Sequence, residues 1–407
     1  MMNTSSIRNS LFIKKEILFI LISSLFSGLA ISIYLFTEQW YVINYLGLKA
    51  SLGIVMMATT IPRVFFMAIG GVLADRFKPS KIMAISVLTR SLLILIILLL
   101  LIQDKFNISI VTITALLFGT LDAFFWPSRD TILARIVPKE SLTQAISMMQ
   151  SVTQFTVIIG PLVGALLLKV GDYTFAFGII GLLLIASSFL LFLVRESYQS
   201  NHEKVNILSD LKEGIQYVWQ SRFLKLILSI FFVVNLLFFG PFMIGMPLIA
   251  HEVLKGDSTT LGYIMSSYSL GMVLSALTLG FVKIRKKRAV LSISFIILEG
   301  ILLILLSQTT SLWESMIYVF LVGVSMSMVN IPLFSLIQET TDPAYVGRVI
   351  SLDTTISLGL VPVSYGLVSQ LISSGISISM IQLVFGSLLT VCSIFTLVFA
   401  RTLYTVD

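Results

Sequence analysis

The sequence predicts an all-α membrane protein in which twelve transmembrane helices form two pseudo-symmetric six-helix bundles. Of its 407 residues, 57% are hydrophobic and 12% are charged, which is far more apolar than a water-soluble domain of this size. The apolar residues are grouped in runs of about 20 residues or more, long enough to cross a bilayer as helices. Two prolines, Pro127 and Pro138, recur 205 residues further along as Pro332 and Pro343, which indicates an internal repeat.

The apolar runs predict where each span lies. The first six are expected at about 17–44, 51–73, 82–102, 108–135 and 142–169, with the sixth ending near residue 194. The second six are expected at about 223–250, 259–282, 289–307, 312–336, 347–373 and 376–400. The predicted organisation is an N-terminal bundle at 1–194, a linker at 195–222 and a C-terminal bundle at 223–407.

The linker is predicted to contain an amphipathic helix. Apolar residues such as Leu211, Ile215 and Trp219 recur with a spacing near 3.6, whereas Asp210 and Glu213 fall on the other face. This pattern is typical of a helix that lies on a membrane surface.

The positions of the basic residues predict the orientation of the chain. The net charge is +7, and most lysines and arginines fall in loops on one side of the predicted membrane. The exceptions are Lys49, Lys105, Lys169 and Lys255 on the other side, with Arg63 and Arg90 inside helices. Positive loops stay in the cytoplasm, so both termini are expected there, in a cell (inner) membrane protein. Because the basic run at 283–288 lies beside a membrane helix, we do not expect nucleic-acid binding.

A charged stretch from Gly70 to Lys81 separates the second and third spans, and we expect it to be a short hinge loop. It resembles the loop signature of the major facilitator superfamily, Gly-x-Leu-Ala-Asp-Arg followed by basic residues. The matching positions are Gly71, Leu73, Asp75 and Arg76. The later part departs from the signature, since only Lys81 keeps the late basic charge.

The fifth span resembles the antiporter signature of the same superfamily. Gly160, Pro161 and Gly164 fit its core of a glycine–proline pair with a small residue four positions after the first glycine. Small residues allow close helix approach and proline bends the backbone, so the segment could seal the two bundles against each other. The resemblance implies export, whereas ordinary helix packing is the alternative interpretation.

Further resemblance points to the drug:proton antiporter branch that contains macrolide efflux pumps and siderophore exporters. It is carried by the stretches at 125–129 and 137–142 and by Gly347-Arg348-Val349. The resemblance covers the full length and implies export, but it does not identify the cargo.

Charged residues inside spans cost about 2.5–3.5 kcal/mol each on insertion scales, so they need a partner, a water-filled cavity or a function. Arg63 lies 12 residues before Asp75, and Asp122 lies 13 before Arg135. At about 1.5 Å per residue both lie near the membrane midplane, and we expect them to be paired. Asp122 is the first candidate for proton coupling; Glu38, near the outer mouth, is second, and Glu299 is third.

The resemblance implies that spans 1, 4, 7 and 10 line a substrate cavity, and that Arg90 and Glu299 lie on peripheral helices. The expected cavity residues are Glu38, Trp40, Asp122, Trp126, Asn235, Phe239, Met326 and Asn330. For the cytoplasmic gate we expect Asp75 near Gly347-Arg348, Arg76 against Asp130, and a contribution from Asp353. Lipid-facing packing is the alternative for any one of the Phe and Met residues.

No phosphate-binding loop of the Gly-x4-Gly-Lys-Ser/Thr type occurs, and His202 and His251 cannot be assembled into a catalytic or metal site. We therefore expect no enzyme activity, no cofactor and no metal. The sequence predicts a monomeric exporter that moves an amphipathic organic molecule across the lipid bilayer in exchange for protons. A dedicated siderophore or metabolite exporter is the alternative, and a non-transporting receptor or scaffold is a hypothesis from another class.

Overall fold

The computed structural model describes residues 15–196, 207–282, 284, 286–343 and 345–400. Within them it contains helices and no strand, and 12 helical segments are long and apolar enough to cross a membrane. The predicted all-α fold with twelve spans is confirmed. Lys283 and Arg285 of the basic run, and 197–206 of the linker, lie outside the described residues.

The chain divides into two compact units. Unit 1 comprises residues 1–47 and 58–203, and unit 2 comprises 48–57 and 204–407. Each unit contains six candidate membrane spans, with the second span contributing its first residues to unit 2.

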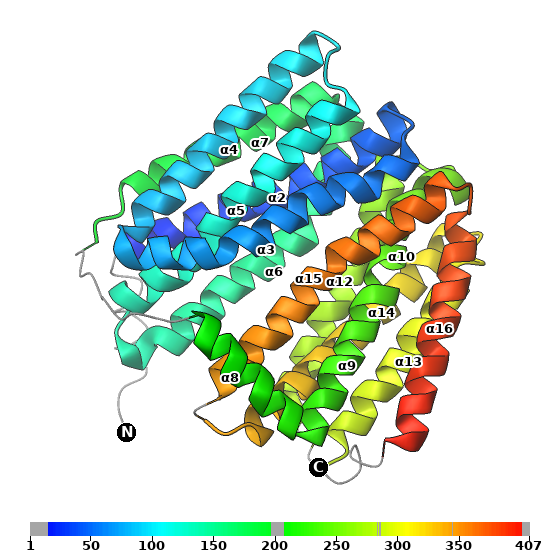
Figure 1. Ribbon diagram of the computed structural model, residues 1–407. Helices are drawn as coiled ribbons and strands as arrows, with labels where there is room; N and C mark the ends of the chain where they lie inside the picture. The colour runs from blue at the N-terminus through cyan, green and yellow to red at the C-terminus, as the bar shows by residue number, and fades with distance from the viewer. Residues whose placement is uncertain (1–14, 197–206, 283, 285, 344, 401–407) are drawn as a thin grey trace. The chain divides into compact units, whose positions relative to one another are not determined.

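Unit 1 is built from one long helix per span (Figure 1). Its elements are α2 (Lys15–Trp40), a π-helical turn η1 (Tyr41–Tyr45), α3 (Leu52–Arg76), α4 (Pro79–Ile102), α5 (Ile108–Ile136), α6 (Lys139–Val170) and α7 (Tyr173–Phe192). Helix α2 packs against α6 and α7, and α4 packs against α5 and α7. The buried charged groups described below lie between these helices.

Unit 2 repeats this arrangement with one broken span. Its elements are η2 (Lys49–Ser51), α8 (Ile207–Gln220), α9 (Arg222–Leu237), α10 (Phe239–Met243), α11 (Gly245–Leu248), a π-helical turn η3 (Ile249–Val253), α12 (Ser258–Phe281), α13 (Arg288–Leu306), α14 (Leu312–Thr340), α15 (Val346–Ser373) and α16 (Ile378–Phe399). Helix α9 packs against α15, and α13 packs against α14 and α16.

The seventh span was predicted as one helix over 223–250, but the structure breaks it into α9, α10 and α11. Pro241 and Pro247 each lack the N–H that would continue the helix. Two backbone groups beside the break are bonded by side chains of neighbouring helices. The Gly240 N–H donates to Ser364 Oγ at 2.8 Å, and Gln382 Nε2 donates to the Pro241 carbonyl at 3.2 Å.

The internal repeat is visible at the helix ends. Asp172 caps the N-terminus of α7 and Ser377, 205 residues further, caps α16. The first and seventh spans each end in a five-residue π-helical turn. These shared details support descent of both bundles from one six-helix plan.

The expected hinge loop is shorter than the sequence indicated. Gly70, Gly71 and Asp75 continue α3 as a helix, and α4 begins at Pro79. Proline is favoured in the first helical turn because the missing N–H is not needed there. Only residues 77 and 78 separate the two helices, so Asp75 and Arg76 lie in the last turn of α3.

Candidate functional site

The most concentrated chemistry of unit 1 is a buried charge cluster around Asp122 in the middle of α5. The residue is 8% exposed. Its Oδ1 accepts a hydrogen bond from Arg90 Nη1 of α4 at 3.3 Å, and its Oδ2 lies 3.4 Å from Arg63 Nε of α3. Three helices therefore supply charged side chains to one point.

Arg63 and Asp122 approach each other as their depths indicated. The side chain of Arg63 is 39% exposed, whereas that of Asp122 is 12% exposed. Arg63 is therefore the member of the cluster that can reach solvent or a ligand.

Arg90 corrects the interpretation of α4 as a peripheral helix without a role in the site. The residue is completely buried and contacts both Asp122 and Ser86 Oγ, the latter at 3.2 Å. A signal for it was present in the sequence, because Arg90 lies 11 residues after Pro79, about 16 Å along its helix and close to the depth of Arg63. Arg90 was not expected in the cluster, because its helix was assigned to the periphery of the bundle.

Trp126 belongs to the same cluster. Its Nε1 donates to Asp122 Oδ2 at 3.0 Å. The Arg129 guanidinium lies 4.3 Å from the centre of its ring and that of Arg63 lies 5.7 Å away, both within the range of cation–π attraction. The indole thus contacts two arginines and donates to Asp122, the acid that is paired with one of them, Arg63.

The cluster carries one excess positive charge, because Arg63 and Arg90 face a single carboxylate. Arg129 does not add to the excess, since its Nη2 lies 2.9 Å from Asp130 Oδ1. With two guanidinium groups and an indole N–H around it, the Asp122 carboxylate is well compensated in its ionised form.

Glu38 is a second buried acid, with a different environment. It lies in the last turns of α2, is 4% exposed and accepts a 2.6 Å hydrogen bond from the Tyr34 hydroxyl. Tyr34 is stacked on Phe118 at 4.0 Å, which fixes the donor. Within the described part of the chain, Glu38 forms no ion pair. The expected alternative of a solvated helix end does not hold, and Trp40 beside it is also buried.

The glycine–proline segment of α6 packs against α2 of its own bundle. A side chain at Gly160 would collide with Ser32, one at Gly164 with Phe36, and one at Gly28 with Thr156. Each pair is 128 residues apart and successive pairs are four residues apart, so the two helices run parallel along a stripe of small residues. The close approach is therefore used inside unit 1, while a seal between the bundles remains a prediction.

Residues expected at the gate have near neighbours within their own units. Arg135 Nη2 donates to the carbonyls of Ala74 and Asp75 at 3.1 and 3.2 Å, which joins the ends of α5 and α3. Asp130 accepts from Arg129. Arg348 Nη1 lies 3.0 Å from Glu213 Oε2 of α8. The proposed contacts of Asp75 with Gly347-Arg348, and of Arg76 with Asp130, remain predictions.

Polar residues of unit 2 expected in the cavity are spread over separate helices. Asn235 is buried and donates to the Phe231 carbonyl and to Ser357 Oγ of α15. Asn330 is exposed and donates to the carbonyl of Met326, which is itself buried, and Phe239 is half-buried. In α15, Asp353 Oδ1 is buried without a hydrogen-bond partner among the described residues.

Glu299 of α13 is the third acid. It is 0% exposed, and neither carboxyl oxygen has a hydrogen-bond partner in the described part of the chain. Among those residues, no group of three or more His, Cys, Asp or Glu side chains is arranged to hold a metal ion.

Comparison with known proteins agrees with the fold and the twelve spans. The family model of the Major Facilitator Superfamily matches residues 20–363. Macrolide efflux protein A of Streptococcus pyogenes is 26% identical over 379 residues, covering 91% of this chain and 90% of that protein. The multidrug efflux pump Tap of Mycolicibacterium fortuitum is 22% identical over 344 residues, covering 82% and 83%.

Solved structures agree in fold. The nucleoside transporter NupG, in a mutant form, has a TM-score of 0.75 at 14% identity and covers 94% of this chain and 99% of that one. An auto-inhibited peptide transporter of the POT family has a TM-score of 0.69 at 14% identity, covering 95% and 96%. The chain belongs to the major facilitator superfamily, in which it is similar to the macrolide efflux proteins, and it is a multi-pass membrane transport protein rather than an enzyme.

Proposed function

We propose that this transporter is a monomeric exporter that moves an amphipathic organic compound, of the macrolide or multidrug type, out of the cell in exchange for protons. The observation that carries the coupling is the pair of differently compensated acids in unit 1, Asp122 and Glu38. The relatives named for macrolide and multidrug efflux support the direction and the class of cargo. Alternating access between two orientations of the bundles is the mechanism that this fold implies.

Of the acids named from the sequence, Asp122 was the first candidate for proton coupling. Its carboxylate already faces two guanidinium groups, those of Arg90 and Arg63, and the Trp126 N–H. Glu38 has one neutral donor and no ion pair within the described residues. A buried ionised carboxylate without a cation is costly, and a proton or a cationic cargo removes that cost. We therefore place Glu38 first, with Asp122 as the charge that positions Arg63.

Orientation follows the basic residues. Lys49, Lys105 and Lys255 lie in connections that follow odd-numbered spans, and Lys169 ends the fifth span. Apart from Arg63 and Arg90 inside helices, most other basic residues lie before the first span or in and beside the connections that follow even-numbered spans, as cytoplasmic charges do. Both termini are proposed to be cytoplasmic in the cell membrane.

Reconstituted vesicles test the proposal. With an imposed pH gradient and no ATP, the purified protein should concentrate a radiolabelled macrolide, and addition of macrolide should drive a proton flux in the opposite direction. Replacing the pH gradient with a Na⁺ gradient should remove accumulation. Binding of the macrolide with no transport under any gradient would contradict the proposal and favour a receptor.

A second candidate, export of an anionic metabolite or siderophore, is favoured by the excess positive charge at the half-exposed Arg63. It is distinguished in the same vesicles, since an anionic cargo would compete with the macrolide or replace it. Substitution Arg63→Gln should weaken export of an anionic cargo and spare that of a cationic one.

A further inference from the structure

A pocket of about 440 Å³ lies within unit 2 between α8, α9 and α15. This volume falls in the range of small-molecule sites, about 300–1,000 Å³. Its walls are apolar side chains from all three helices, except for Lys225 and Ser229 of α9. Figure 1 shows α8 beside the ends of α9 and α15, which it contacts.

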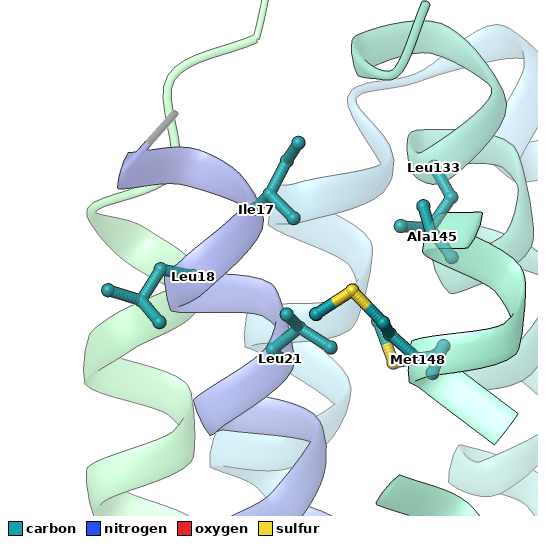
Figure 2. Close-up of a pocket in the computed structure, with 7 residues that line it drawn as sticks. Ile17, Leu18, Leu21, Leu133, Ala145 and Met148 are labelled. Atoms are coloured by element: carbon teal, nitrogen blue, oxygen red, sulfur yellow. The ribbon is translucent and has the colours of Figure 1, made fainter. Parts of the chain in front are cut away.

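Two other hollows among the described residues do not offer the same chemistry. The pocket in Figure 2 is lined only by apolar residues of α2, α5 and α6, and its volume of about 10 Å³ is that of a single water. A hollow of about 100 Å³ between α9, α13 and α16 contains no charged side chain. The pocket at α8 is distinguished by its size and its cation.

Lys225 is available to an anion. Its Nζ lies 5.8 Å from the centre of the Trp219 ring, and no acidic residue in the described part of the chain forms an ion pair with it. Trp219 is 71% exposed and Phe232 is 46% exposed. The Lys225 ammonium group therefore lies beside exposed aromatic side chains that a ligand can contact.

The pocket extends from the membrane surface into the apolar layer. Lys225 lies in the first turns of a helix whose apolar span begins at Arg222. Phe232 lies seven residues further, about 10 Å deeper. The other wall is α8, which carries the amphipathic pattern of a helix lying at the surface. A ligand that matches both ends has an anionic head at the surface and a hydrocarbon tail inside.

We propose that this pocket binds one anionic phospholipid, with its phosphate at Lys225 and an acyl chain along Phe232 and Ile356. A zwitterionic lipid has a phosphate too, but its own ammonium group neutralises that phosphate, so Lys225 favours a lipid with a net negative charge. The proposal concerns a lipid rather than the cargo, and it is independent of which compound is exported.

Lipid in this position would fasten α8 to α15. The two elements are already joined by the Arg348–Glu213 ion pair and by the stacking of Tyr217 on Tyr345 at 4.5 Å. The Tyr217 hydroxyl also accepts a hydrogen bond from the Asp342 N–H at 3.0 Å. Because Trp219 of α8 and Leu352 of α15 both line the pocket, an acyl chain between them extends the same joint.

Native mass spectrometry of the full-length protein in detergent tests the proposal, with phosphatidylglycerol and phosphatidylcholine of identical acyl chains as probes. The first bound phosphatidylglycerol should be held at least fivefold more tightly than phosphatidylcholine. Lys225→Gln should weaken that binding about fivefold, the effect of one lysine near a membrane surface. Ser229→Phe, which fills the pocket, should weaken it at least tenfold.

Matched variants control for charge and folding. Lys169→Gln removes an exposed lysine of unit 1, and Ser229→Ala keeps the pocket open, so both should bind as the unsubstituted protein does. In hydrogen exchange, phosphatidylglycerol should protect the backbone of α8 at 213–220, and Lys225→Gln should raise the lipid concentration needed for half of this protection about fivefold, a readout that does not depend on Ser229→Phe.

Equal affinity for the two lipids, or unchanged phosphatidylglycerol binding in Lys225→Gln, would overturn the assignment. Displacement of the lipid by a macrolide at matched concentration would also overturn it, because the pocket would then belong to the path of the cargo.

Discussion

Arg90 and Glu299 lie in corresponding helices of the two bundles, the third and ninth spans, and have opposite surroundings. Arg90 lies 11 residues after the first residue of α4, and Glu299 lies 11 after the first residue of α13. Both side chains are completely buried. Arg90 meets Asp122 at 3.3 Å, whereas neither oxygen of Glu299 has a hydrogen-bond partner within the described residues.

This difference teaches that the repeat has kept its packing while its charges have diverged. Gly160 of α6 lies against Ser32 of α2 in unit 1. Unit 2 also has a glycine–serine contact between two helices, in which Ser364 of α15 lies against Gly240 of α10 and accepts a hydrogen bond from its N–H. Unit 1 holds the compensated charge cluster, and unit 2 holds a broken helix. We accordingly assign the ionic chemistry to unit 1.

The largest effect should come from removing Arg90. Arg90→Leu leaves the buried Asp122 carboxylate with only the half-exposed Arg63 as a cation. Loss of one member of a buried ion pair costs about 3–5 kcal/mol. We expect a strongly lowered apparent melting temperature of the purified protein in detergent.

The double variant Arg90→Leu/Asp122→Leu is its control, because it removes the stranded charge. It should recover most of the stability lost in Arg90→Leu. If Arg90→Leu alone were as stable as the unsubstituted protein, the pair would not anchor unit 1.

A smaller loss of stability should come from crowding the contact between α6 and α2. Gly160→Ser would push a side chain into Ser32, and overpacking costs about 1–3 kcal/mol. Adding Ser32→Gly should restore stability, because it removes the side chain with which the new serine collides. Gly178→Ala is the control, since a Cβ there meets no neighbouring atom; a loss of stability in Gly178→Ala equal to that in Gly160→Ser would count against the packing argument.

Glu299 should respond in the opposite direction to Arg90. Glu299→Leu removes a buried acid whose oxygens have no hydrogen-bond partner in the described structure, and it leaves no polar group behind. Because an unsatisfied polar group costs about 1–3 kcal/mol, the melting temperature should stay unchanged or rise. A clear fall in the melting temperature would mean that Glu299 has a stabilising cation or donor.

The smallest loss of stability should come from removing an N-terminal helix cap. Asp257 caps α12, accepting from the Thr259 and Thr260 N–H groups, whereas α3 has no side-chain cap at the N-terminus of its preceding turn η2. Asp257→Ala should cost about 1 kcal/mol, and Asp257→Asn should cost less. Both are measured as shifts in melting temperature at neutral pH.

The same residue gives a pH dependence. The Thr259 hydroxyl bond lowers the pKa of Asp257 below its ordinary value of 3.8. A lowered pKa stabilises the folded state above the ordinary value, and this contribution disappears as the pH falls through the folded pKa. The difference between the unsubstituted protein and Asp257→Ala should therefore be constant near neutral pH and shrink only in acid.

Much of the fold could be predicted from hydrophobicity, because the number and length of the apolar runs determine how often the chain crosses a bilayer. The pairing of Arg63 with Asp122 could also be predicted. The rise per residue is constant in a helix, so counting residues from the helix ends gives the depth of each side chain in the membrane. The same count would have found Arg90 too, had its helix not been treated as peripheral.

Other features depend on tertiary contacts that no local pattern contains. The small-residue spacing at Gly160 indicates close approach but does not say which helix approaches. The glycines before Asp75 are typical of a loop, yet α3 continues through them and ends at Arg76, shortly before Pro79. Pro241 and Pro247 were visible in the seventh span. An apolar run does not show, however, whether neighbours such as Ser364 and Gln382 can bond the backbone groups beside a break in the helix.

The most direct test of the account separates the two acids of unit 1 by transport in vesicles. Glu38→Gln should abolish pH-driven accumulation of a macrolide while retaining exchange of labelled for unlabelled macrolide across the membrane. Asp122→Asn should lower both activities together, because it disturbs the position of Arg63 rather than the proton. The account would be contradicted if Glu38→Gln accumulated macrolide normally while Asp122→Asn lost accumulation and kept exchange.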